Sequence, residues 1–130
     1  MGGDANVSRL LAVALGGLLG SSARYLVTGW AQRLLGPSFP WGTAIVNVTG
    51  CFLIGLLMTW GVGSIPMRVE SRLFLVTGLL GGFTTFSAFG YETMRFLQDG
   101  ASLMALANLG LNLVAGLAAV LVGSLVARSF

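Results

Sequence analysis

The sequence has no histidine, no lysine and a single cysteine, Cys51. The lack of histidine excludes His-based acid–base catalysis, a catalytic triad that uses histidine, and a histidine metal site. One cysteine can form neither an intrachain disulfide nor a thiolate cluster. The acidic residues are spread along the chain at Asp4, Glu70, Glu92 and Asp99. We therefore do not expect an enzyme, because few groups remain that could carry catalysis.

Charged residues are also scarce. They make up 8% of the 130 residues, against about 25% in a soluble domain, whereas 55% of the chain is hydrophobic. The net charge of +3 comes from scattered arginines, which form no basic patch for nucleic acid. This composition excludes an ordinary soluble enzyme, a disordered chain and a nucleic-acid binder. The 20 glycines, about twice the usual share, favour close helix packing in a membrane.

Long uncharged runs predict four transmembrane helices. A helix needs about 20 mostly apolar residues to cross the hydrocarbon core. Residues 34–67, 73–91 and 100–127 carry no charge, and residues 10–32 carry only Arg24. The expected spans, all in one domain over residues 1–130, are Leu10–Gln32, Trp41–Val62, Leu73–Leu97 and Ala101–Ala127. The stretch from Gly61 to Ser71, which contains Pro66, is expected to connect the second and third spans. Because strand-like alternation is missing, we expect an all-α membrane protein and not a β-barrel.

The first span is expected to stay on the protein. The small residues Ser21, Ser22 and Ala23 resemble a signal-peptide cleavage site. However, Asp4 precedes the lone early arginine, Arg9, whereas a signal peptide begins with a positively charged segment.

The arginines give little information on orientation. With four spans, the N-terminus, the connection between the second and third spans and the C-terminus share one side. That side carries Arg9, Arg68, Arg72 and Arg128, and the opposite side carries Arg33 and Arg95. Four against two is a weak positive-inside bias. Two interpretations therefore stay open: a single orientation, or insertion both ways, which would allow an antiparallel dimer.

Several polar side chains fall inside the predicted spans. Arg24 has no acid in its own span; either it reaches toward the interface, or it attracts anions. Asn47, in the second span, can be explained as a residue that forms a hydrogen bond between helices. Asn108 and Asn112 are four residues apart and share one face of the fourth span. Their amide N–H donors could form a polar track that replaces water around an anion.

The third span contains the most distinctive stretch, residues 78–89, GLLGGFTTFSAF. Three glycines and the adjacent Thr84 and Thr85 weaken a helix, so we predict a break in mid-membrane, where non-helical backbone must be buried or line a cavity. Freed carbonyls there could hold a cation such as Na⁺. The alternative is close packing through Gly78 and Gly82.

Phenylalanines follow this predicted break. Phe83, Phe86 and Phe89 recur every three residues and share a face. A phenyl ring has a positive edge, which could stabilise a small anion without holding it as tightly as a full charge does. The alternative is again packing.

Three stretches together carry a family resemblance. They are Gly16–Gly20 with Ala23-Arg24-Tyr25, then Trp41-Gly42-Thr43 to Val46-Asn47, and Gly78–Phe89 followed by Tyr91-Glu92. Taken together, over residues 10 to about 125, they resemble the Fluc/CrcB fluoride channels. One difference lies in the fourth span, where some relatives carry Tyr and Ser and this chain has Asn108 and Asn112.

The resemblance implies a multi-pass channel in the cell membrane that passively exports F⁻ from the cytoplasm and so lowers its toxicity. It implies an antiparallel, dual-topology homodimer with two pores and a central Na⁺ that is structural and not transported. Backbone carbonyls of Gly81 and Thr84, two from each subunit, would hold that ion.

The resemblance also assigns roles to side chains. Phe86 and Phe89 match the pore phenylalanines, and Asn47 the asparagine beside them. Further matches are Thr85 and Ser87 as flanking residues, Asn108 and Asn112 along the polar track, Arg24 as the arginine of the first span, and Glu92 as a vestibule carboxylate.

Two other functions remain open. A proton-coupled small multidrug transporter also has four short spans and forms antiparallel dimers. It needs a membrane carboxylate, typically in the first span, where this chain has none; Glu92 is the only candidate. A structural subunit, in which the polar groups only join helices, is the second alternative.

Overall fold

The computed structural model describes residues 2–63 and 67–130, and over these residues the secondary structure is entirely helical. The elements in chain order are α1 (Gly2–Leu35), α2 (Trp41–Gly63), α3 (Val69–Arg72), η1 (Leu73–Leu80), α4 (Gly81–Phe83), α5 (Phe86–Gln98), α6 (Ser102–Leu109), η2 (Gly110–Ala115) and α7 (Gly116–Ala127). The elements η1 and η2 are wider, π-type turns within longer helices.

These elements form four helical units long and apolar enough to cross a membrane. They cover Gly3–Leu35, Trp41–Gly61, Val69–Gln98 and Ser102–Ala127. The prediction of an all-α chain with four such helices is confirmed. The first helix begins well before the predicted Leu10. Charge limits how far a segment can sit in hydrocarbon, but a helix continues through charged residues because its backbone bonds do not depend on them.

The predicted connection between the second and third spans, Gly61 to Ser71, is wrong at both edges. Helix α2 continues to Gly63, and α3 already begins at Val69. Pro66, which was expected within this connection, lies outside the described residues. Glycine in a helix loses only about 1 kcal/mol relative to alanine, so α2 continues past Gly61.

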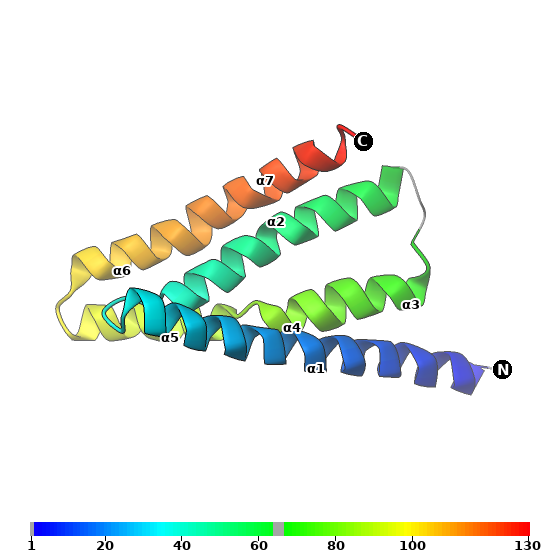
Figure 1. Cartoon of the computed structure of the whole chain (residues 1–130), viewed down its shortest axis with the longest axis horizontal. Helices are drawn as coiled ribbons and strands as arrows, with labels where there is room; N and C mark the ends of the chain where they lie inside the picture. Colours follow the sequence, from blue (N-terminus) through cyan, green and yellow to red (C-terminus); the bar gives the residue numbers. More distant parts are fainter. Residues whose placement is uncertain (1, 64–66) are drawn as a thin grey trace.

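The helices pack in two pairs (Figure 1). Helix α1 runs along η1 and α4, and α2 runs along α7. Helix α5 turns back through Gly100, which has a φ of 74°, so that α6 packs beside it. Both chain ends and the C-terminal end of α2 lie at the same end of the molecule. The chain therefore has the up-and-down course expected of four spans.

Glycines bring the paired backbones into contact. A Cβ on Gly20 of α1 would collide with the carbonyl of Leu79. A Cβ on Gly78 or Gly82 would lie 2.7 Å from carbonyl oxygens of α1. On the other pair, a Cβ on Gly55 of α2 would collide with the carbonyl of Val120. These helices are held by close packing of small residues, as is usual in membranes.

The third helical unit changes backbone geometry at two residues. Thr84 has φ −87° and ψ 158°, and Thr85 has φ −150° and ψ 111°, both in the extended region. The glycines before them stay helical, although we expected them to contribute to weakening the helix. Gly78 and Gly82 instead pack against α1, as the alternative interpretation held. Helix α5 then starts at Phe86, with the Thr85 hydroxyl accepting from the Ala88 N–H.

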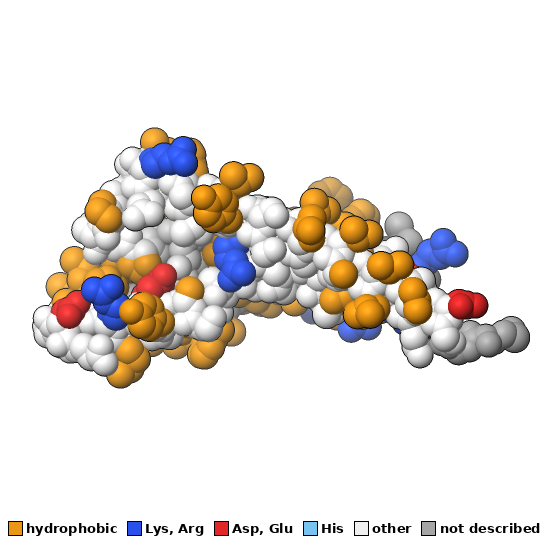
Figure 2. All heavy atoms as spheres, turned by 90° about the horizontal axis from the view of Figure 1, so that it is seen from below, with side chains coloured by type: hydrophobic (Ala, Val, Ile, Leu, Met, Phe, Trp, Pro, Cys, Tyr) orange, Lys and Arg blue, Asp and Glu red, His pale blue; other side chains and the backbone are white. Residues whose placement is uncertain are grey.

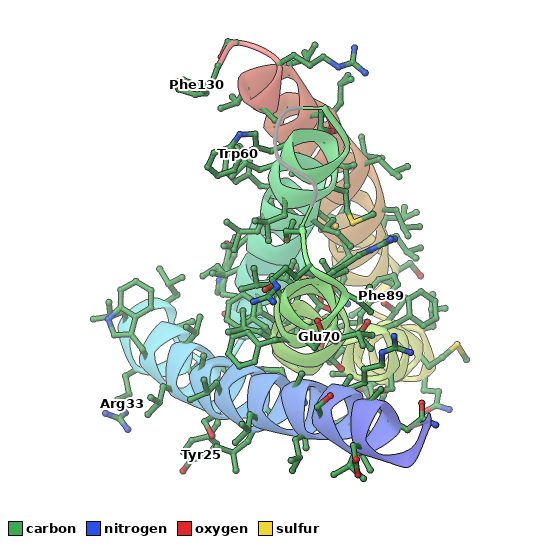
Figure 3. All side chains as sticks on the ribbon, turned by 90° about the vertical axis from the view of Figure 1, so that its right-hand side faces the viewer. Tyr25, Arg33, Trp60, Glu70, Phe89 and Phe130 are labelled. Carbon is green, nitrogen blue, oxygen red and sulfur yellow. The ribbon has the colours of Figure 1, made fainter. Side chains whose placement is uncertain are left out.

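Most large apolar side chains of the single chain are exposed, and the face in Figure 2 carries only a few scattered charges among apolar groups. Tyr25 and Arg33 project from α1 away from the other helices (Figure 3). An outward apolar surface of this kind suits lipid or a second copy of the chain.

Candidate functional site

An open hollow of about 320 Å³ lies where α2, α4, α5 and η2 meet. Its wall brings together predicted site residues from three of the four helical units: Asn47, Gly81, Thr84, Thr85, Phe86, Phe89 and Asn112. No arginine or carboxylate is among its lining residues. The hollow is therefore lined by uncharged hydrogen-bonding groups, phenyl rings and aliphatic side chains.

Asn47 binds the extended backbone of Thr85 through both atoms of its amide. Its Oδ1 accepts from the Thr85 N–H at 2.7 Å, and its Nδ2 donates to the Thr85 carbonyl at 3.0 Å. Extended backbone directs the N–H and C=O of one residue to the same side, as in a strand pair. A carboxamide carries an adjacent donor and acceptor that match this spacing. Asn47 therefore satisfies the two backbone groups that leave the helix at Thr85.

The extended residues also release two carbonyl oxygens from their helical partners. In a continuous helix the Thr85 N–H would bond the Gly81 carbonyl, and the Ala88 N–H would bond the Thr84 carbonyl. Here the Thr85 N–H donates to Asn47, and the Ala88 N–H donates to the Thr85 hydroxyl at 3.2 Å. Gly81 and Thr84 both line the hollow, so their carbonyls become candidate ligands for a cation.

Phe86 and Phe89 are in contact, but their environments differ. Their ring centroids are 5.4 Å apart and the planes lie at 68°, an edge-to-face arrangement. Phe89 is 4% exposed, whereas Phe86 is 77% exposed in the single chain. Phe89 is thus part of the packed wall, and Phe86 is free to meet lipid, solvent or a partner.

The two asparagines of the fourth helical unit are hydrogen-bonded to each other and to Asn47. Asn47 Nδ2 donates to Asn112 Oδ1 at 2.7 Å, and Asn112 Nδ2 donates to Asn108 Oδ1 at 3.0 Å. Asn108 Nδ2 donates to the Thr93 hydroxyl at 2.9 Å. Thr93 is not among the site residues predicted from the sequence. Its spacing of four residues after Phe89 places both on one face of α5, which is the signal that could have found it.

A second hollow, of about 340 Å³, lies beside Glu92. The Thr43 hydroxyl donates to Glu92 Oε1 at 2.7 Å. The other oxygen, Oε2, is buried and has no hydrogen-bond partner among the described residues. Arg95 and Asp99 line the same hollow and form an exposed ion pair at 3.9 Å. This space therefore differs from the first in carrying charged groups.

Three predicted residues stand apart from these spaces. Arg24, on α1, lines neither hollow and is in no ion pair within the described part of the chain. Ser87 is exposed and reaches the site only through its hydroxyl, 3.4 Å from that of Thr85. Asn108 is fully buried behind Asn112 and lines neither hollow.

Comparison with known proteins matches the sequence of this chain to one family. The profile of the family described as "CrcB-like protein, Camphor Resistance (CrcB)" matches residues 11–124. The chain is 46% identical over 122 residues to a protein of Anaeromyxobacter dehalogenans named "Fluoride-specific ion channel FluC", covering 94% of this chain and 97% of that one.

Two further relatives carry the same name. The Agrobacterium fabrum protein is 47% identical over 117 residues, which cover 90% of this chain and 94% of the relative. The Geobacter sulfurreducens protein is 50% identical over 112 residues, which cover 83% and 90%. Identity at this level, over nearly the whole of both chains, shows that the protein is a multi-pass membrane protein of the CrcB family.

Proposed function

We propose that this chain is the subunit of a fluoride-specific ion channel. The observation that carries the proposal is the hollow lined by Asn47, Phe86 and Phe89, which presents polar groups and phenyl rings without a charged side chain. The relatives named as fluoride-specific channels support the same conclusion. The activity is passage of an ion, with no bond made or broken, and so it is not enzymatic.

The chemistry of the hollow suits a strongly hydrated small anion. An ion that leaves water needs replacement donors, yet conduction requires that binding remain weak enough for release. The amide donors of Asn47 are already hydrogen-bonded to Thr85 and Asn112. When fluoride binds, an Asn47 N–H would therefore exchange a carbonyl acceptor for the fluoride ion. The net free-energy gain of such an exchange is small. A fixed arginine at the same place would hold the anion too tightly.

We assign the pore walls as follows. Phe86 and Phe89 present ring edges, while Asn47 and Asn112 supply amide donors; Thr85 and Ser87 support the turn that carries the rings, and Asn108 stands behind Asn112. Glu92 is assigned to a vestibule outside this narrow part, and Arg24 to attraction of the anion from a distance. Flow down the electrochemical gradient would export F⁻ from the cytoplasm, because HF enters neutral and ionises inside.

We also propose an antiparallel, dual-topology homodimer in the cell membrane, with two pores. Its support is the incomplete enclosure of the hollow by one chain and the 77% exposure of Phe86. A second copy would close the hollow and cover that ring. The weak arginine bias between the two sides allows both insertions.

A structural Na⁺ fits the donor chemistry at the start of α5. The carbonyls of Gly81 and Thr84 have lost their helical partners to Asn47 and Thr85, and freed carbonyls of broken helices hold Na⁺ in transporters. Two carbonyls do not complete a shell, so we assign two from each subunit. The ion would supply a fixed charge that holds the two copies together, and it would not be transported.

Fluoride efflux from liposomes that contain the purified protein tests the function. We expect an electrode to record rapid F⁻ efflux and no comparable Cl⁻ efflux. Efflux no faster than from empty vesicles, or equal for both anions, would refute the channel. In a second arm, a large organic cation replaces Na⁺ on both sides; unchanged fluoride efflux there would refute the Na⁺ site while leaving the channel intact. Flux that is unaffected by Phe86→Ile and Asn47→Leu would favour the structural-subunit interpretation.

A further inference from the structure

Five hydrogen bonds run in one direction through the buried side of the fluoride site, from the Thr85 N–H to the Phe89 carbonyl. In order, the donors and acceptors are Thr85 N to Asn47 Oδ1, Asn47 Nδ2 to Asn112 Oδ1, Asn112 Nδ2 to Asn108 Oδ1, Asn108 Nδ2 to Thr93 Oγ1, and Thr93 Oγ1 to Phe89 O. The donor–acceptor distances lie between 2.7 and 3.0 Å. We call this set the amide chain.

The two ends of the amide chain fix its direction. A carboxamide can be turned over so that its N–H₂ and C=O exchange places, and nothing in one asparagine prevents this. The chain, however, begins at a backbone N–H, which can only donate, and ends at a backbone C=O, which can only accept. Turning over any one asparagine would bring donor against donor and acceptor against acceptor. All three amides and the Thr93 hydroxyl therefore have a single orientation that satisfies them together.

Both ends also belong to the same turn of α5. Thr85 and Phe89 are four residues apart, and the turn between them carries Phe86 and ends at Phe89. From Thr85 the amide chain passes through α2, η2 and α6 and returns to α5 at Thr93. The amide chain is therefore bonded to both ends of the turn from Thr85 to Phe89, which we call the phenylalanine turn.

We infer that Thr93 and Asn108 are positioning residues of the channel, which orient Asn112, Asn47 and the phenylalanine turn without touching the ion. The inference rests on the proposed function and assigns Asn108 an indirect role in it. Thr93 is 6% exposed and Asn108 0%, and neither lines the hollow. An ion in the hollow meets Asn47 and Asn112. Asn112 Nδ2 donates to both the backbone carbonyl and the Oδ1 of Asn108, so the Asn108 side chain helps to hold the Asn112 amide in place.

The hydroxyl of Thr93 is the group on which this role depends. A threonine in a helix commonly donates to the carbonyl four residues earlier, as Thr93 does to Phe89. In this chain the same oxygen also accepts from Asn108 Nδ2. Without it, Asn108 retains only a long contact of 3.4 Å to the Phe89 carbonyl. The Asn108 amide would then be held less firmly, and with it the Oδ1 that accepts from Asn112 Nδ2. Asn47 stays fixed by Thr85, and Asn112 keeps its bond to the Asn108 backbone carbonyl.

The test compares Thr93→Val with Thr93→Ser and with Thr77→Val in the full-length protein in liposomes. Valine keeps the branched shape and removes the hydroxyl, and serine restores it. Thr77 is an exposed threonine of η1 in the same helical unit, so its change controls for the loss of a hydroxyl. We expect Thr93→Val to slow fluoride efflux per assembled protein by about tenfold, the effect of roughly one hydrogen bond. Thr93→Ser and Thr77→Val should stay within a factor of about two.

The outcomes separate this inference from the function on which it rests. Wild-type protein that gives no fluoride efflux refutes both. Wild-type efflux that Thr93→Val leaves unchanged refutes the positioning role alone. If fluoride efflux is slow in Thr93→Val and equally slow in Thr93→Ser, the positioning role is also refuted, because loss of the hydroxyl is then not the cause. If Thr93→Val does not assemble, Thr93→Ala gives the same comparison; if neither assembles while Thr93→Ser does, Thr93 is a folding residue and the inference is wrong.

Discussion

Two regions of the molecule hold helices together by opposite means. One is the contact of α1 with η1 and α4. The other is the amide chain, which joins α2, α5 and the fourth helical unit. The first works through absent side chains, since Gly16 and Gly20 let the backbone of η1 approach directly. The second works through side chains that each need a particular donor and acceptor, such as Asn47 with Asn112. Lipid provides no hydrophobic force between helices, so membrane proteins depend on packing and hydrogen bonds of these two kinds.

The glycine contact determines where the backbones of the helices lie, whereas the amide chain determines where the polar groups point. The glycine contact excludes any added atom but needs no specific group in return. The amide chain tolerates a change of volume more readily than the loss of one donor, because an unpaired polar group in an apolar interior costs about 1–3 kcal/mol. Substitutions in the two regions should therefore change different measured quantities.

The largest loss of stability is expected from Gly20→Ala. The added methyl would collide with the Leu79 carbonyl, which is rigid backbone, so α1 must move away from η1. Overpacking of this kind costs about 1–3 kcal/mol, and occasionally more. Gly29→Ala is the matched control on the same helix, because a Cβ there meets no atom within 4 Å. Thermal unfolding in detergent should show a clear fall for Gly20→Ala and none for Gly29→Ala; equal midpoints would contradict the packing interpretation.

Asn47→Leu should reduce fluoride flux more than Gly20→Ala does. It leaves the Thr85 N–H and carbonyl without the partners that Asn47 gives them. Each buried polar group left unpaired costs about 1–3 kcal/mol, and water in the open hollow that Asn47 lines offsets part of this cost. Because the extended turn is then unsupported, we expect fluoride efflux to fall to the level of empty vesicles. Thr59→Val, further along α2, is the control for a polar-to-apolar change. Assembled Asn47→Leu protein with normal efflux would show that the amide only joins helices.

Phe86→Ile should abolish fluoride efflux while leaving the folding of each chain almost unchanged. Its ring is 77% exposed in the single chain, so little packing within the chain is lost, but the positive ring edge disappears. Phe89→Ile should also abolish efflux and, because Phe89 is 4% exposed, lower the unfolding midpoint. Efflux is read together with gel filtration. Dissociation of the proposed dimer by either change would identify the rings as packing residues.

The smallest effect is expected from Ser124→Ala. Ser124 donates to the Gly55 carbonyl across the α2–α7 contact at 3.4 Å, a long bond. Hydrogen bonds between membrane helices average about 0.6 kcal/mol, and this one should contribute less. Thermal unfolding should be almost unchanged and fluoride efflux normal. A loss as large as that of Gly20→Ala would show that hydrogen bonds, and not glycine packing, hold this contact.

Much of the architecture could be predicted from composition. The positions of the arginines separated four apolar segments, and four such helices are present. Gly78 and Gly82 were recognised as a small-residue pair, and both pack against α1. The predicted connection from Gly61 to Ser71 is too long, because α2 continues past Gly61 to Gly63 and α3 begins at Val69. The extended backbone falls on Thr84 and Thr85 because Asn47 is present to satisfy Thr85, a condition that no local pattern contains.

The sequence by itself determined that this protein belongs in a membrane, where its helices lie along the chain, and which polar residues had to be satisfied inside it. Only the tertiary structure decided how they are satisfied. Asn47 meets Thr85 and Asn112, which are 38 and 65 residues away along the chain, and Asn108 meets Thr93. These pairings depend on how each helix is rotated and crosses its neighbours. Helical periodicity alone does not set that rotation.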